Sequence, residues 1–305
     1  MNTTHSKPDF PLMHFPVRLH TLALFLVSGI TCSMAQVTLL DDLHRQVTLP
    51  RPATRIVSLA PSITESLFAI GAGDQVIGVT DYCNFPPGVR LCHRVGGMIN
   101  PSIETIVGLS PDLIIVSMEG NQRQDFTTLT GLHIPVFVTN PRTLEGINLS
   151  LRQLGTLTGR TREAAKLVDS LSRRTAQLRA DGGTRRTRTI FFVSMQPLMA
   201  VGAKTFLNEL VTAAGGENLA AASGLTYPSL SREMVLTQDP EVLFITSDAV
   251  DSTGSITALY PEWTQLSAVR SGHVYRIDPD LVARPGPRAV DGLALIISYL
   301  RTGHP

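Results

Sequence analysis

One long helical pattern near the middle of the chain constrains the fold more than any other feature. Between residues 161 and 180 the apolar residues recur every three, four or seven positions, and neither proline nor glycine interrupts them. A helix of this length extends roughly 30 Å, which is enough to run along a small lobe. Gly182 and Gly183 then break the pattern. We therefore expect a stiff helix that joins the two parts of the chain on either side of it.

Short apolar runs alternate with helical patterns in both of these parts. Strands that are apolar throughout and separated by helices predict a parallel sheet covered on both faces. We expect strands at residues 55–60, 76–80, 113–116 and 134–138 in the first part, and at 189–193, 242–246 and 274–277 in the second. The second part also predicts helices at residues 206–214, 231–236 and 288–300.

The predicted fold class is therefore α/β, with two lobes, each a mostly parallel sheet flanked by helices, joined by one long rigid helix. A chain of 305 residues is long enough for two such domains. A short hairpin over residues 37–49 opens the first lobe. The expected boundaries are residues 36–158 for the N-terminal lobe, 159–182 for the linking helix and 183–305 for the C-terminal lobe.

The N-terminus has the pattern of an export signal. Arg18 precedes an apolar run that ends at a small-x-small cleavage pattern over residues 33–35. We expect residues 1–35 to be a cleaved signal peptide and the mature protein to lie in the periplasm. Cys32 leaves open a lipid-anchored lipoprotein, and translation could start at Met1 or at Met13.

Composition and motifs exclude several classes of function. Lys and Arg number 26 against 25 Asp and Glu, so the chain has no basic field to attract nucleic acid. It has no phosphate-binding loop, no Gly-x-Ser-x-Gly turn and no HExxH motif, and its histidines are too scattered to suggest a metal site. We expect no catalytic residues and no cofactor. An exported α/β hydrolase stays an alternative because catalytic triads converge only in the fold. A sensor or partner-protein module stays another.

Cys83 and Cys92 are the only cysteines left after removal of residues 1–35. In an oxidising compartment such a pair can form a disulfide. Two free buried thiols are the alternative, and the sequence leaves both open.

Ordered motifs along the whole mature chain resemble a known family. They lie at residues 55–65, 79–87, 95–97 and 101–114 in the first part, and at 215–218, 227–228, 231–233 and 286–288 in the second. The set resembles the helix-linked periplasmic binding proteins for iron-siderophores, haem and cobalamin, and most closely the members that bind cobalamin. The resemblance implies a monomeric substrate-binding protein that captures a chelate and delivers it to the permease dimer of an ABC importer.

The same resemblance implies roles for two glutamates. Glu104 and Glu233 match the acids, one per lobe, that pair with arginines of the permease subunits. Independently of the resemblance, two carboxylates far apart on rigid lobes can orient a docking protein. The alternative is that both are ordinary exposed glutamates at helix starts, where a negative charge is favoured.

The implied ligand site lies in the cleft between the lobes. Tyr82 and Tyr227 match positions where cobalamin binders place aromatic rings against the corrin, and flat rings suit a large macrocycle. Met98 and Met199 stand where relatives carry larger rings and can still pack on a macrocycle, with core filling as the alternative. Arg284 is a further candidate contact, with a solvated loop arginine as its alternative. The predicted ligand is cobalamin or a related corrinoid; a siderophore or haem is the second possibility.

Overall fold

The computed structural model describes residues 1–3, 5, 36–181, 186–249 and 256–302. Within the chain, Ala35–Pro305 forms one compact unit, and the account below concerns this unit. The predicted signal peptide, with Cys32 and the cleavage pattern at 33–35, lies outside the described residues except for its first few. It stays a prediction, as does the lobe boundary near residue 183.

A hairpin opens the compact unit, as the sequence predicts. β1 (Val37–Leu40) and β2 (Gln46–Leu49) pair antiparallel. The buried Asp41 carboxylate shapes the turn, because it accepts hydrogen bonds from the backbone N–H groups of Leu43 and Arg45 at 3.0 and 2.9 Å. Asp42 N–H donates to the Val138 carbonyl at 3.1 Å, which joins the hairpin to the first sheet.

The first sheet has five parallel strands in the order β5-β4-β3-β6-β7. Its central strand β3 (Ile56–Ser58) is fully buried, which agrees with its continuous apolar sequence. The other strands are β4 (Val76–Val79), β5 (His93–Arg94), β6 (Leu113–Ser117) and β7 (Val136–Thr139), and the helices of this part are α1 (Pro61–Ala69), α2 (Ile103–Gly108) and α3 (Arg123–Gly131).

The second sheet has the order β10-β8-β11-β12, all parallel, with β9 antiparallel against β8. These strands are β8 (Thr187–Met195), β9 (Leu198–Ala200), β10 (Gly216–Asn218), β11 (Val242–Thr246) and β12 (Val274–Ile277). Its helices are α6 (Phe206–Ala213), α7 (Arg232–Gln238), α8 (Ile256–Leu259), α9 (Ser267–Arg270), α10 (Pro279–Val282) and α11 (Ala289–Thr302). Short 3-10 turns complete the unit at Gly73–Gln75, Pro87–Leu91, Leu219–Ser223 and Pro261–Gln265.

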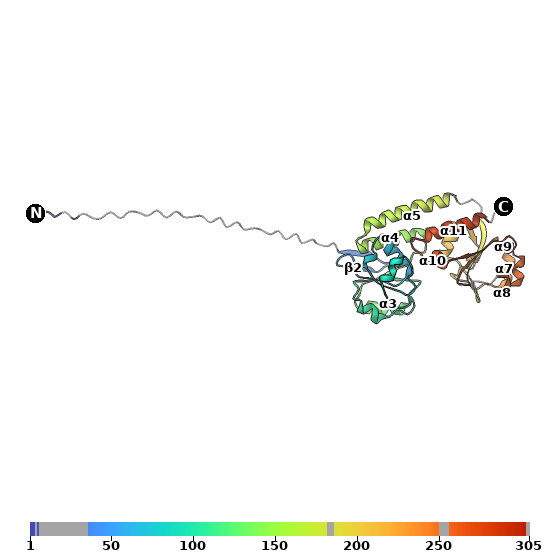
Figure 1. The fold of residues 1–305 in the computed structure, drawn as a ribbon, viewed down its shortest axis with the longest axis horizontal. Coiled ribbons are helices and arrows are strands. Elements are labelled where there is room, and N and C mark those ends of the chain that lie inside the picture. The colour runs from blue at the N-terminus through green and yellow to red at the C-terminus, as the bar shows by residue number, and fades with distance from the viewer. Residues whose placement is uncertain (4, 6–35, 182–185, 250–255, 303–305) are drawn as a thin grey trace. The chain divides into compact units, whose positions relative to one another are not determined.

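Two helices join the sheets. α4 (Leu144–Thr158) ends at Gly159, whose φ of 71° lies in the left-handed region that glycine adopts without strain. α5 (Thr161–Asp181) is the predicted linking helix, 21 residues long; it packs on α4 and on α11 and runs along one side of both halves (Figure 1). Arg174 of α5 pairs with Asp291 of α11 at 2.6 Å.

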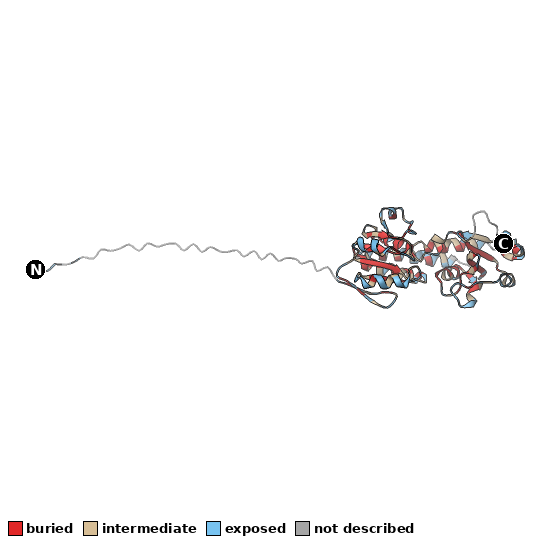
Figure 2. Cartoon of the chain, turned by 90° about the horizontal axis from the view of Figure 1, so that it is seen from below, coloured by how far each residue is buried: buried red, intermediate tan, exposed pale blue. Residues whose placement is uncertain are grey.

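The apolar core follows the same plan. One cluster is continuous from the first half through α4 and α5 into α6 and α11, and two smaller clusters lie on the other faces of the sheets. Buried residues accordingly line the strands of both halves in Figure 2. The predicted α/β class, with two parallel sheets flanked by helices and a long helix between them, is confirmed.

Candidate functional site

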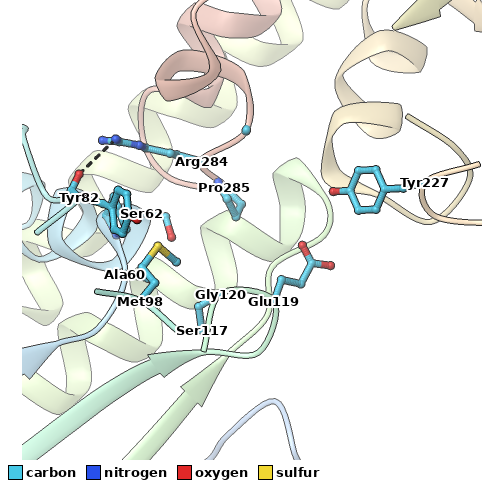
Figure 3. Close-up of a pocket in the computed structure, with 12 residues that line it drawn as sticks. Ala60, Ser62, Tyr82, Met98, Ser117, Glu119, Gly120, Tyr227, Arg284 and Pro285 are labelled. Carbon is cyan, nitrogen blue, oxygen red and sulfur yellow. Dashed lines mark hydrogen bonds between the residues drawn. The ribbon is translucent and has the colours of Figure 1, made fainter. Parts of the chain in front are cut away.

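A cavity of about 330 Å³ opens between the two halves. The first half contributes residues that follow the carboxyl ends of β3, β4 and β6, where open parallel sheets commonly bind ligands. The second half contributes the segment after α10 and one residue beyond the Leu219–Ser223 turn. Figure 3 shows this lining, which consists of Ala60, Pro61, Ser62, Tyr82, Met98, Ser117, Glu119, Gly120, Tyr227, Ala283, Arg284 and Pro285.

Two tyrosines bring aromatic surface to the cavity, one from each half. Tyr82 is 60% exposed and Tyr227 is 45% exposed, values far above those of the core aromatic residues. Met98 lies beside Tyr82 (Figure 3). Three of the predicted ligand contacts therefore share one cavity, with unburied apolar surface that a ring-shaped ligand could cover.

An asparagine organises the floor of the cavity. Asn121 donates from its amide nitrogen to the carbonyls of Leu59 and Met98, at 2.9 and 2.8 Å. Its amide oxygen accepts from the Ser117 N–H at 2.8 Å. These bonds hold the segment that carries Met98 against the ends of β3 and β6.

Glu119 lies on the first-half side of the cavity. Its carboxylate accepts from Arg142 in an ion pair of 3.1 Å, and Arg142 also donates to the Lys204 carbonyl of the second half at 3.2 Å. Glu119 and the hydroxyl end of Tyr227 point toward one another (Figure 3). Burial, and then the negative charge of Glu119, raise the pKa of Tyr227 above its ordinary value, so its phenol is neutral at physiological pH.

Arg284 lines the cavity, but its terminal N–H groups donate to other groups of the protein. One terminal nitrogen donates to Glu65 at 2.9 Å and to the Asn84 side-chain oxygen at 2.7 Å. The other donates to the Tyr82 carbonyl at 3.3 Å and pairs with the Asp280 carboxylate. Only 13% of the side chain is exposed. The solvated loop arginine that the sequence left open as an alternative is therefore wrong, because Arg284 ties the second half to the first.

Glu65 is the centre of this connection. It is 3% exposed, and it also accepts two hydrogen bonds from Arg288, from Nε at 2.8 Å and from Nη2 at 2.6 Å. The guanidinium of Arg288 lies over the Phe85 ring, 4.4 Å from its centroid. The hydrogen bonds with Glu65 raise the pKa of Arg288, which keeps its charge. We call Glu65, Asn84, Asp280, Arg284 and Arg288 the Glu65 clasp.

Met199 differs from its expected place. It lies on β9 and bridges to Ser229, and it is not among the described residues that line the cavity. It is half-buried and is not among the described residues of the three apolar clusters, so its role as a ligand contact or as core filling stays a prediction.

Cys83 and Cys92 are free thiols in the structure, the second of the two alternatives. The Cys83 sulfur is buried and lies 3.2 Å from the Thr64 hydroxyl and 3.3 Å from the Thr80 hydroxyl. The Cys92 sulfur lies 3.2 Å from the Val76 carbonyl, and burial raises the pKa of this thiol.

Glu104 and Glu233 lie outside the cavity, on the first turns of α2 and α7. Both are exposed. Each follows a serine that caps its helix, since Ser102 accepts from Thr105 N–H at 3.2 Å and Ser231 from Met234 N–H at 3.1 Å. Hydrogen bonds with its own backbone N–H and with Ser231 lower the pKa of Glu233, which keeps it ionised.

Other kinds of site find no support in the parts of the chain that the structure describes. Within those ranges, no three His, Cys, Asp or Glu side chains gather in an arrangement that could hold a metal ion. None of the helices in the described segments is both long and apolar enough to cross a bilayer.

Sequence reasoning missed Glu119 as a cavity residue and Glu65 as the centre of the clasp. Glu119 had a usable signal, because it comes two residues after the end of an apolar strand, where parallel sheets place ligand contacts. Glu65 had none, because its partners lie 219 and 223 residues further along the chain.

Comparisons with known proteins agree with this geometry. A family model described as "Periplasmic binding protein" matches residues 56–281. A vitamin B12-binding protein of Vibrio cholerae is 30% identical over 254 residues, 83% of this chain and 91% of the relative. The crystal structure of the periplasmic vitamin B12-binding protein BtuF of Vibrio cholerae has a TM-score of 0.76 at 29% identity, covering 83% of this chain and 98% of that one.

Two further similar proteins are a haem-binding protein and an ABC transporter lipoprotein. The periplasmic haem-binding protein RhuT of Roseiflexus has a TM-score of 0.74 at 25% identity, over 83% of this chain and all of that one. A Bacillus subtilis ABC transporter substrate-binding lipoprotein of uncharacterised specificity is 29% identical, over 84% of this chain and 83% of the relative. The chain belongs to the periplasmic binding protein family, whose members are substrate-binding components of ABC transporters and not enzymes.

Proposed function

We propose that this protein binds cobalamin or a related corrinoid in the cavity between its halves and delivers it to the permease of an ABC importer. The observation that carries the proposal is the pair of exposed rings, Tyr82 and Tyr227, which reach the cavity from different halves. Relatives named for vitamin B12 binding, in sequence and in structure, support the corrinoid as the ligand.

The size of the cavity bears on how the ligand enters. A volume of about 330 Å³ is at the small end of ligand pockets, and a complete corrinoid needs more room. The halves would therefore separate when the ligand binds. The bond from Arg142 to the Lys204 carbonyl is a single contact of a half-exposed side chain, so it is the connection most easily broken. The Glu65 clasp, whose central carboxylate is buried and bound by two arginines, would stay closed and act as the pivot.

Delivery rests on the two exposed glutamates. Glu104 and Glu233 would each meet an arginine of one permease subunit, which fits a two-subunit permease facing a two-lobed protein. In this proposal residues 36–158 and 183–305 are the two lobes, and the protein acts as a monomer in the periplasm after removal of residues 1–35.

A haem ligand is the second candidate, because the RhuT structure is nearly as similar as the BtuF structure. Titration of the purified protein with cyanocobalamin, haemin and a ferric siderophore separates the two. We expect cyanocobalamin to bind with Kd at or below about 1 µM, which corresponds to about 8 kcal/mol. Tight binding of haemin or siderophore alone would replace the corrinoid, and binding of none of the three would contradict the proposal.

A further inference from the structure

The charges around the cavity bear on which side chains a ligand can carry. Among the described residues that line it, only Glu119 and Arg284 are charged. Arg284 is thus the one cationic side chain among the described residues that line the cavity.

Arg284 has no terminal donor left for a ligand. A guanidinium has two N–H groups on each terminal nitrogen. Those of Nη1 have Glu65 and Asn84 as partners, and those of Nη2 have the Tyr82 carbonyl and Asp280. A ligand carboxylate that bound the terminal nitrogens of Arg284 would therefore have to displace a protein partner, and one of these partners, Glu65, is buried.

The charge of Arg284 is also balanced within the clasp. Two guanidinium groups, of Arg284 and Arg288, face two carboxylates, of Glu65 and Asp280. The side chain of Glu65 is only 2% exposed, so these charges interact where solvent screens them little. The clasp therefore presents no net positive charge to the cavity.

Glu119 makes the cavity less favourable still for an anion. Its side chain is 44% exposed and lines the cavity, while its partner Arg142 is not among the lining residues. The positive end of α1, at Pro61 and Ser62, acts in the opposite direction. That end carries about half a charge, and Pro61 has no N–H to donate; the Glu119 carboxylate, although Arg142 pairs with it at 3.1 Å, is the full charge that borders the cavity.

We infer that the cavity selects a corrinoid whose rim carries uncharged amide side chains, and discriminates against rings that carry carboxylates. Amide N–H groups can donate to Glu119, and amide carbonyls can accept from the hydroxyls of Tyr227, Ser62 or Ser117. An ionised carboxylate has no hydrogen to donate to Glu119, and the negative charge of Glu119 repels it. This inference rests on the proposed function, since it specifies the ligand of the same site.

The test compares two ligands that differ by one charge. Cyanocobalamin and its monocarboxylate, in which one peripheral propionamide is hydrolysed to a propionate, are titrated into the full mature protein. We expect the monocarboxylate to bind at least about tenfold more weakly, which is about 1.4 kcal/mol. Equal affinities would overturn the inference and leave the corrinoid proposal standing. Failure of both ligands to bind would instead overturn the proposed function.

Three variants show whether the charge of Glu119 sets the ratio of the affinity for cyanocobalamin to the affinity for its monocarboxylate. Glu119→Gln removes the repulsion and releases Arg142, so the ratio should fall to within about threefold of one. Arg142→Gln leaves Glu119 unpaired, so the ratio should rise by a further factor of about three. The double variant also lacks the Glu119 carboxylate, so its ratio should stay close to that of Glu119→Gln. If Glu119→Gln only loosened the packing, the affinities for both ligands would fall by the same factor and their ratio would not change. That result would contradict the role of Glu119.

A matched control is Glu145→Gln. Glu145 is an exposed glutamate on the first turn of α4 that pairs with Arg179 at 3.3 Å, and it does not line the cavity. The ratio of affinities for the two ligands should stay at the wild-type value in this variant. A change as large as that in Glu119→Gln would show that the charge of the whole protein, not the cavity, decides the selectivity.

Discussion

At the scale of single residues, the Glu65 carboxylate is buried between two arginines that come from the other half of the molecule. A buried ion pair adds little to stability when it replaces apolar packing, but removing one partner is severe because the other charges stay buried. Glu65 therefore fixes how the halves meet, and its loss should be costly even though the intact ion pairs add little net stability.

We expect Glu65→Gln to lower the free energy of unfolding by about 3–5 kcal/mol, because two guanidinium groups lose the negative charge that balances them. Urea unfolding measures the change. Asp169→Asn is the control, since Asp169 pairs with Arg152 at 3.5 Å on the surface and should lose less than about 1 kcal/mol. Similar losses in the two variants would show that the clasp is no stronger than a surface pair.

At this scale the sequence predicts which residues line the cavity, but it does not predict the contacts of the clasp. Tyr82, Met98, Tyr227 and Arg284 could be assigned to one site because family motifs surround them, and the structure brings all four to one cavity. The partners of Arg284 could not be assigned, because a contact between residues 219 positions apart depends on how two sheets pack.

At the scale of elements, the crossing of α4 and α5 is unusually close. A Cβ atom on Gly155 of α4 would lie 2.5 Å from the Ala164 Cβ and 3.1 Å from the Arg160 carbonyl oxygen. The carbonyl belongs to the backbone of the turn between the helices and cannot move aside easily. Gly155 therefore sets the distance at which the linking helix begins.

Gly155→Ala tests this packing. Alanine favours a helix over glycine by about 1 kcal/mol, but overpacking costs about 1–3 kcal/mol, so we expect a net loss of stability. Gly131→Ala in α3 is the control, because a Cβ there meets nothing within 4 Å. Thermal unfolding should show a lower Tm for the first variant and an unchanged or higher Tm for the second. A rise in both would mean that the helices can separate without penalty.

Elements were predictable to the extent that their own residues determine them. β11 and β12 begin and end where their apolar runs do, and α5 follows its uninterrupted pattern. The short strands β9 and β10 were not predicted. Their three residues each carry no periodic signal, and both exist because β8 offers them an edge to pair with.

At the scale of the whole molecule, each half carries one of the two glutamates that we propose for docking. Glu104 and Glu233 each stand two residues after a capping serine, on a short exposed helix of a different sheet. A core that is continuous through α4 and α5 connects the halves. Such a molecule could present both carboxylates to one permease at a nearly constant separation.

Charge reversal at both sites, Glu104→Lys with Glu233→Lys, should reduce cobalamin uptake in cells by at least about tenfold, because each lysine would face a permease arginine. Cyanocobalamin affinity of the purified protein should stay unchanged. Glu163→Lys is the control, since Glu163 also lies on the first turn of a helix, α5, and should leave uptake normal. Normal uptake with both docking charges reversed would exclude this mode of docking.

The central claim is that a corrinoid lies between the rings of Tyr82 and Tyr227. Titration with cyanocobalamin, followed by the visible absorbance of the corrin, tests it in wild type, in Tyr82→Ala/Tyr227→Ala and in the double phenylalanine variant that keeps both rings. We expect saturable one-to-one binding to wild type, near-normal binding to the phenylalanine variant, and affinity at least about 100-fold lower without the rings, which is about 2.7 kcal/mol. Wild-type affinity in the alanine variant, or no binding to wild type, would contradict the account.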